Sequence, residues 1–236
     1  MPIAYTPAQR HAINCILSVF ETGRLPNPAA YATCTILPDG AGISYGMHQS
    51  TDRAGSLDNI VKRYIELGGV HAAALKAYLP YVASNKSATE PPNGPWSAET
   101  QAAVSLLKAA ASDPLMQRAQ EEVFDRDYFQ PAVAHANQIG LTKALSLAVV
   151  YDTCIHSGPG GVNLIRNMFP AKSPANGGDE ATWVKAYIAS RREWLLRSTN
   201  PLVRQTIYRM DALAELVSTG NWDLKPPFKV RTVTVA

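Results

Sequence analysis

Two acidic residues near the start of the chain have the types and surroundings that cleavage of a glycosidic bond requires. Glu21 closes an apolar, helix-like segment, and Asp39 lies in a glycine-rich turn between two strand-like runs. Such hydrolysis uses one acid to protonate the leaving oxygen and one carboxylate to activate water or to attack the sugar. The two groups need different environments, so that one stays protonated near neutral pH while the other is ionised. A helix end packed on a core and a solvated hairpin turn would supply that difference.

The segment before Glu21 predicts an amphipathic helix. Apolar residues recur at helical spacing, so we expect a helix over residues 6–20 that delivers Glu21 near its C-terminal end. Thr6 and Gln9 have the spacing of a capping box, and Gly23 is well placed to stop the helix.

The segment around Asp39 predicts a β-hairpin. Residues 31–37 are rich in β-branched and aromatic types, Pro38-Asp39-Gly40 has turn chemistry, and residues 43–45 can return as a partner strand. The prolines at 26 and 28 separate this hairpin from the preceding helix.

A helix that ends in Glu, followed by a hairpin that carries Asp, is the plan of lysozyme-like active sites. The chain resembles glycoside hydrolase family 46, the chitosanase family of the lysozyme superfamily. The resemblance implies that Glu21 is the general acid, that Asp39 is the general base of an inverting hydrolysis, and that Ser44 helps to hold the attacking water. Further matches follow in the family's order over nearly the whole chain: residues 55–64, 140–152, 156–160 and 220–227.

The resemblance also implies the fold and the remaining site residues. We expect a mainly α (α+β) structure: one lysozyme-like domain over residues 1–236, in two lobes, with a small antiparallel hairpin by the cleft. The proline-rich segment near residues 85–96 is the expected lobe boundary. The residues expected to bind substrate are Tyr45, His48, Gln49 and His156, and those expected to support the site are Asp152, Arg191 and Arg192, with Arg204 a further candidate partner for Asp152.

The departures from the family concern the substrate. Chitosanases pair carboxylates with the protonated amines of glucosamine, and Ser56 stands where one such acid is expected, with Asp58 nearby. The later segment 191–198 is basic, and the chain has 22 Lys and Arg against 19 Asp and Glu. A basic surface attracts an anionic polymer and repels a polycation. The sequence therefore favours bacterial peptidoglycan as substrate, with chitosan as the alternative and a non-catalytic glycan-binding module as a second alternative.

Composition indicates the cellular location of the protein and its partner proteins. No apolar run is long enough to span a membrane, residues 1–5 lack the pattern of a secretory signal, and the three cysteines are widely spaced. We therefore expect synthesis in the cytoplasm and action at the bacterial cell wall or periplasm. An antibacterial endolysin released through a holin, or an effector with a secretion apparatus and an immunity protein, would fit, as a monomer.

Other chemistries have less support. His48 and His156 lack His-x-x-x-His or Cys-x-x-Cys companions, so no metal is expected, and no cofactor. The glycine-rich residues 158–161 lack the Lys and Ser or Thr of a phosphate-binding loop, and nucleic acid is not an expected partner.

Overall fold

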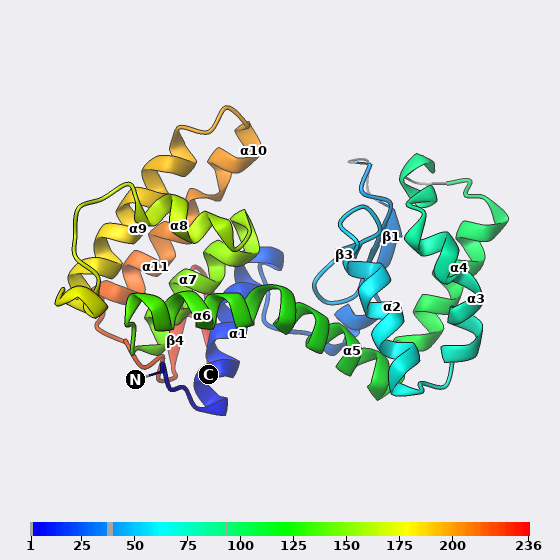
Figure 1. The fold of residues 1–236 in the computed structure, drawn as a ribbon, viewed down its shortest axis with the longest axis horizontal. Helices are drawn as coiled ribbons and strands as arrows, with labels where there is room; N and C mark the ends of the chain where they lie inside the picture. The colour runs from blue at the N-terminus through cyan, green and yellow to red at the C-terminus, as the bar shows by residue number, and fades with distance from the viewer. Residues whose placement is uncertain (1, 37–39, 93) are drawn as a thin grey trace. The chain divides into compact units, whose positions relative to one another are not determined.

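The computed structural model describes residues 2–36, 40–92 and 94–236 (Figure 1). The expected mainly helical fold with a small antiparallel β region is confirmed. The helices are α1 (Pro7–Thr22), α2 (Ser56–Leu67), α3 (Ala72–Ala83), α4 (Ala98–Ala110), α5 (Pro114–Phe124), α6 (Gln130–Ile139), α7 (Ala144–Ser157), α8 (Gly160–Arg166), α9 (Glu180–Leu196), α10 (Pro201–Arg204) and α11 (Tyr208–Ser218). Short helical turns are η1 (Pro28–Ala32), η2 (Lys86–Thr89), η3 (Asp125–Phe129), η4 (Pro174–Asn176) and η5 (Gln205–Ile207), and the strands are β1 (Cys34–Ile36), β2 (Ile43–Tyr45), β3 (Ser50–Thr51), β4 (Phe228–Val230) and β5 (Val233–Val235).

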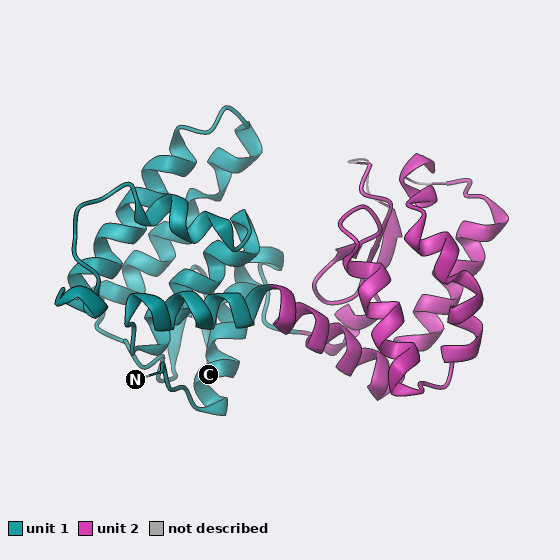
Figure 2. Ribbon diagram, viewed as in Figure 1, with its two compact units in different colours: residues 1–26, 128–236 teal, residues 27–127 magenta. Residues whose placement is uncertain are grey.

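The chain forms two compact units (Figure 2). Unit 1 comprises residues 1–26 and 128–236, and unit 2 comprises residues 27–127. The proline-rich segment 85–96, where we expected the lobe boundary, lies inside unit 2. The chain instead changes unit beside the Pro26-Asn27-Pro28 break and again within η3, a π-helical turn between α5 and α6.

Unit 1 is organised around α7. Every residue from Ala144 to Cys154 is buried, and α1, α6, α8, α9 and α11 all contact this helix (Figure 1). A helix that is apolar on all sides is stable only when other elements cover it completely. Any polar group that α7 carries within this stretch is therefore removed from water and must find its partners inside the unit.

Unit 2 holds a three-stranded antiparallel sheet in the order β1-β2-β3. Ser44 in the central strand pairs with Thr35 on one side and Thr51 on the other. All three residues of β2 are buried, because the core of the unit covers both faces of this short strand.

The first strand is shorter than the sequence predicts. Tyr31 belongs to η1, so β1 begins at Cys34; residue 37, the expected end of the strand, lies outside the described residues. The Asn27 side chain accepts a hydrogen bond from the Ala29 N–H at 3.0 Å, and Pro28 occupies the first turn. A capped turn with proline at its start favours helical geometry over extension.

The described residues contain neither a membrane-spanning helix nor a cluster of metal ligands. Within residues 2–36, 40–92 and 94–236, no helix has the length and apolar character needed to cross a membrane. The same described residues hold no group of three or more His, Cys, Asp or Glu side chains placed to bind a metal ion.

Candidate active site

Glu21 lies in the last turn of α1, where local sequence places it. The Thr6 hydroxyl accepts a hydrogen bond from the Gln9 N–H, and the Gln9 side chain accepts one from the Thr6 N–H, so the expected capping box starts the helix. Gly23 ends it in the left-handed conformation, with φ at 73°. The buried face of α1 packs into unit 1, and the Glu21 side chain remains 48% exposed.

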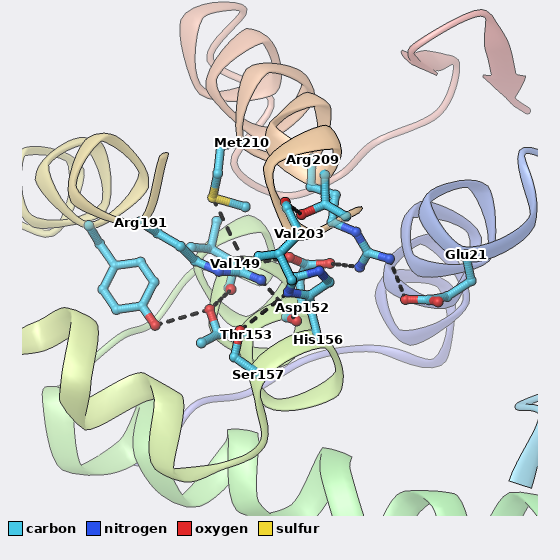
Figure 3. Close-up of polar contacts among 12 residues, drawn as sticks. Glu21, Val149, Asp152, Thr153, His156, Ser157, Arg191, Val203, Arg209 and Met210 are labelled. Atoms are coloured by element: carbon cyan, nitrogen blue, oxygen red, sulfur yellow. Dashed lines mark hydrogen bonds and ion pairs between the residues drawn. The ribbon is translucent and has the colours of Figure 1, made fainter. Parts of the chain in front are cut away.

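A buried arginine holds the Glu21 carboxylate. Arg209, from α11, donates to Glu21 at 2.6 Å and to Asp152 at 2.8 Å (Figure 3). The neighbouring Tyr208 hydroxyl donates to the Phe20 carbonyl at 2.6 Å. The end of α1 is therefore held by α11 through both a side chain and the backbone.

Asp152 is the centre of this network (Figure 3). It projects from α7, is fully buried, and binds Arg191 from α9 as well as Arg209. Burial alone would raise the pKa of Asp152, but the two guanidinium groups outweigh burial and hold the pKa below its usual range. Burial likewise lowers the pKa of Arg209, but Asp152 and then Glu21 more than offset this effect and raise it.

His156 lies beside this cluster. Its ring Nδ1 is 3.3 Å from the Ser157 hydroxyl, and both residues belong to the last turn of α7. Burial, with the positive charges of Arg209 and Arg191, lowers the pKa of His156 to about 4. The imidazole is therefore neutral near pH 7, and a neutral ring can donate one hydrogen bond and accept another.

The other arginines expected near Asp152 lie elsewhere. Arg192 points away from the cluster and pairs with Asp211 at 2.7 Å on the surface, because adjacent helical residues face directions about 100° apart. Arg204 donates to the backbone carbonyls of Ser198 and Thr199.

Sequence reasoning missed Arg209, although α11 carries a usable signal. Arg209 is three, four and seven residues from Ala212, Leu213 and Leu216, so it lies on the helix's buried stripe. An arginine at such a position requires a carboxylate partner, since an unpaired buried charge is costly.

The residues expected around the general base lie in unit 2. The Ser44 hydroxyl is buried and donates to the Gln49 side chain at 2.9 Å, and Gln49 also donates to the Gly46 carbonyl at 2.8 Å. His48 stacks on Phe124 with ring centroids 3.6 Å apart. Asp39 lies outside the described residues.

Tyr45 does not fit its expected role in substrate binding. Its side chain is fully buried in the core of unit 2, and its hydroxyl donates to the Leu107 carbonyl at 2.9 Å. Tyr45 lies in the expected strand, at the end of β2. Both faces of that strand are covered, so its ring is not available to a polymer in solution.

The buried ion cluster generates a test of stability. We predict that Asp152→Asn lowers the free energy of unfolding by about 3–5 kcal/mol, because it leaves two buried guanidinium charges without their carboxylate. The matched control is Asp211→Asn, which removes the exposed partner of Arg192 and should cost much less. Urea unfolding of both variants checks this, and equal small losses would contradict the role assigned to the buried cluster.

Comparisons with known proteins identify the family. The sequence profile of Glycosyl hydrolase family 46 matches residues 15–228. A chitosanase from Bacillus subtilis (strain 168) is 29% identical over 235 residues, covering 95% of this chain and 82% of that protein. A chitosanase from Streptomyces sp. (strain N174) is 31% identical over 232 residues, covering 92% and 77% respectively.

The fold is also shared with a solved structure. A crystal structure of a mutant chitosanase from Bacillus subtilis MY002, complexed with 6 GlcN, is similar at a TM-score of 0.80 and 26% identity, over 97% of this chain and 96% of that one. The family profile matches most of the chain, and the fold similarity extends over 97% of it. The chain therefore belongs to glycosyl hydrolase family 46 and is a glycosidase of β-1,4-linked amino-sugar polymers.

Proposed function

We propose that this enzyme is a chitosanase, which hydrolyses β-1,4 bonds between glucosamine units of chitosan. The observation that carries the proposal is the match over more than nine-tenths of the chain to two chitosanases, together with a fold neighbour that was crystallised with 6 GlcN. These comparisons favour chitosan, the alternative in the sequence analysis, over peptidoglycan, for which they offer no support.

In the proposed mechanism, Glu21 protonates the glycosidic oxygen while Asp39 removes a proton from the attacking water, which reaches the anomeric carbon from the opposite face. The contact between Glu21 and Arg209 supports the first role, because it fixes the carboxylate at the end of a rigid helix. Arg209 is itself held by Asp152, so the position of Glu21 depends on the core of unit 1.

Ser44 has a more limited part in this mechanism than the resemblance implies. Its hydroxyl proton is donated to Gln49, so only the oxygen lone pairs remain to receive a hydrogen bond from water. Gln49, with φ at 51°, is fixed in turn by its bond to the Gly46 carbonyl. We infer that Gln49 orients the Ser44 hydroxyl as an acceptor.

Peptidoglycan remains a second candidate because Asp58 and Glu193, the acids in the two segments where amine-pairing residues are expected, each pair with a basic side chain of this chain. Ser56 accepts a hydrogen bond from the Thr51 N–H at 3.0 Å and so joins α2 to β3. Asp58 binds Lys62 at 2.5 Å. In the basic segment of α9, Glu193 pairs with Arg197 at 3.4 Å. A polycationic substrate would have to compete with these internal cations.

We predict that Glu21→Gln and Asp39→Asn each lower kcat on chitosan by about 100- to 10,000-fold, the usual contribution of a general acid or base. Both variants should still bind chitosan oligosaccharides, and their unfolding midpoints should stay close to that of the wild type. Glu66→Gln is a matched control, because Glu66 is an exposed acid that pairs with Arg63. A Glu21→Gln or Asp39→Asn enzyme with wild-type kcat would refute the residue's assigned role.

The substrate is tested by digesting two polymers in parallel. We expect glucosamine oligosaccharides from fully deacetylated chitosan and little or no release from purified bacterial sacculi, as read by mass spectrometry. Muropeptides from sacculi together with intact chitosan would instead establish the second candidate. Because the same enzyme preparation is used in both digests, an inactive preparation is recognised when neither polymer releases products.

A further inference from the structure

The backbone that follows the proposed general base is attached to two buried polar side chains. The Ile43 N–H donates to the Ser87 hydroxyl at 2.8 Å, and the Ser87 hydroxyl in turn donates to the Asp52 carboxylate. Ser87 belongs to η2, whereas Asp52 lies in the turn between β3 and α2. We call these two residues the Ser87–Asp52 pair.

Further contacts fix the same backbone from the other side. The Asp52 N–H donates to the Ile43 carbonyl and the Arg53 N–H donates to the Ala41 carbonyl, each at 3.2 Å. Gly42 packs directly on the pair: its φ is 77°, and a Cβ at this position would collide with the Ser87 hydroxyl and crowd the Asp52 Cβ. A side chain at residue 42 would therefore displace either the pair or the turn.

The pair is unusual because it keeps a carboxylate in an environment that disfavours its charge. Ser87 is fully buried and Asp52 is 6% exposed. Burial raises the pKa of Asp52 to about 6, although hydrogen bonds from Ser87 and Ile43 partly oppose this change. Asp58 of α2 raises it further. Burial raises the pKa of Cys34 in β1 and of Tyr81 in α3, and the nearby Asp52 charge adds to both shifts.

This environment makes the Asp52 charge a cost to folding at neutral pH. A carboxyl whose pKa is higher in the folded state binds more protons there than in the unfolded chain, so its contribution to stability falls as pH rises from about 4 to about 6. Among the described residues, Asp52 Oδ1 has no hydrogen-bond partner. A buried group with this cost is better explained by a task in the site than by a contribution to stability.

We propose that Ser87 and Asp52 are positioning residues for the general base: they hold the Gly40–Ile43 segment, and through it the adjoining Asp39. The inference rests on the role of Asp39 in the proposed function. Ser87 supplies the bond to the segment, and Asp52 orients the Ser87 hydroxyl so that its lone pair faces the Ile43 N–H. Neither side chain contacts substrate, so both act on turnover through Asp39.

Ser87→Ala removes the bond to Ile43 and should lower kcat on chitosan oligosaccharides by about 10- to 100-fold, since small displacements of a catalytic group cost that much. KM should change by less than about two-fold, because the pair does not touch substrate. The matched control is Ser84→Ala, three residues earlier, where the hydroxyl donates only to the Tyr81 carbonyl of its own helix end. Wild-type kcat in Ser87→Ala would overturn the proposal.

Two substitutions of Asp52 separate positioning from charge. Asp52→Asn keeps an oxygen that accepts from Ser87 and removes the buried charge, so it should retain most of kcat and unfold at a higher urea concentration than the wild type at pH 7. Asp52→Ala removes the acceptor and should lose kcat to about the same extent as Ser87→Ala. Equal kcat for Asp52→Asn and Asp52→Ala would count against the bond to Ser87.

The decisive experiment repeats Ser87→Ala in the Asp39→Asn enzyme. If the pair acts through Asp39, the second substitution should cause almost no further loss of the residual rate. The same fold-loss in both backgrounds would overturn the positioning role while leaving the proposed function intact. Wild-type activity in Asp39→Asn would show that Asp39 is not the general base, and it would refute this inference as well. A wild-type enzyme inactive on chitosan would refute the proposed substrate alone.

Discussion

The buried Asp152 carboxylate between Arg191 and Arg209 is the interaction on which the rest of unit 1 depends. It lies on a helix that is covered on all sides, so its charge can exist there only with cations supplied by α9 and α11. These ion pairs fix which faces of the two outer helices meet α7. Asp152 pairs with Nη1 of Arg209, and the other terminal nitrogen, Nη2, donates to Glu21 at the end of α1. Through this connection, the packing of the core determines the position of Glu21, the exposed proposed general acid.

Unit 2 positions the residues near the proposed general base by different means. The sheet is small and its central strand is buried on both faces. Near this strand, hydrogen bonds of hydroxyl, amide and carboxylate side chains hold the backbone and the Ser44 hydroxyl, with no arginine in these bonds. Ser44 is oriented by Gln49, and the turn that follows Asp39 is held by Ser87 and Asp52. The Glu21 carboxylate is thus held by an ion pair, whereas the Gly40–Ile43 segment is held by polar contacts with Ser87 and Asp52.

Local features of the fold could be predicted from the sequence, whereas long-range partners could not. The capping box of α1, its end at Gly23 and the mainly helical architecture follow from residues a few positions apart. The contact between Arg209 and Glu21 joins residues 188 positions apart, so only the buried stripe of α11 hints at it. Tyr45 is buried, although we expected it to bind substrate. The sequence of a single strand does not reveal that other elements cover both of its faces. The short hairpin of β4 and β5 went unpredicted, although residues 228–235 carry the alternation that a strand pair requires.

The central claim is that Arg209 connects the core to the proposed general acid, because it binds Asp152 and Glu21 through different nitrogens. The kcat of Arg209→Lys on chitosan oligosaccharides, measured beside its unfolding midpoint, tests this claim most directly. Lysine keeps the positive charge near Asp152, but it lacks the planar fork whose two nitrogens reach Asp152 and Glu21 separately. We expect kcat to fall by about 100-fold at a temperature where the variant is fully folded, a loss comparable to the effect of misplacing a catalytic group. A folded Arg209→Lys enzyme with wild-type kcat would contradict the account, because charge alone would then be sufficient.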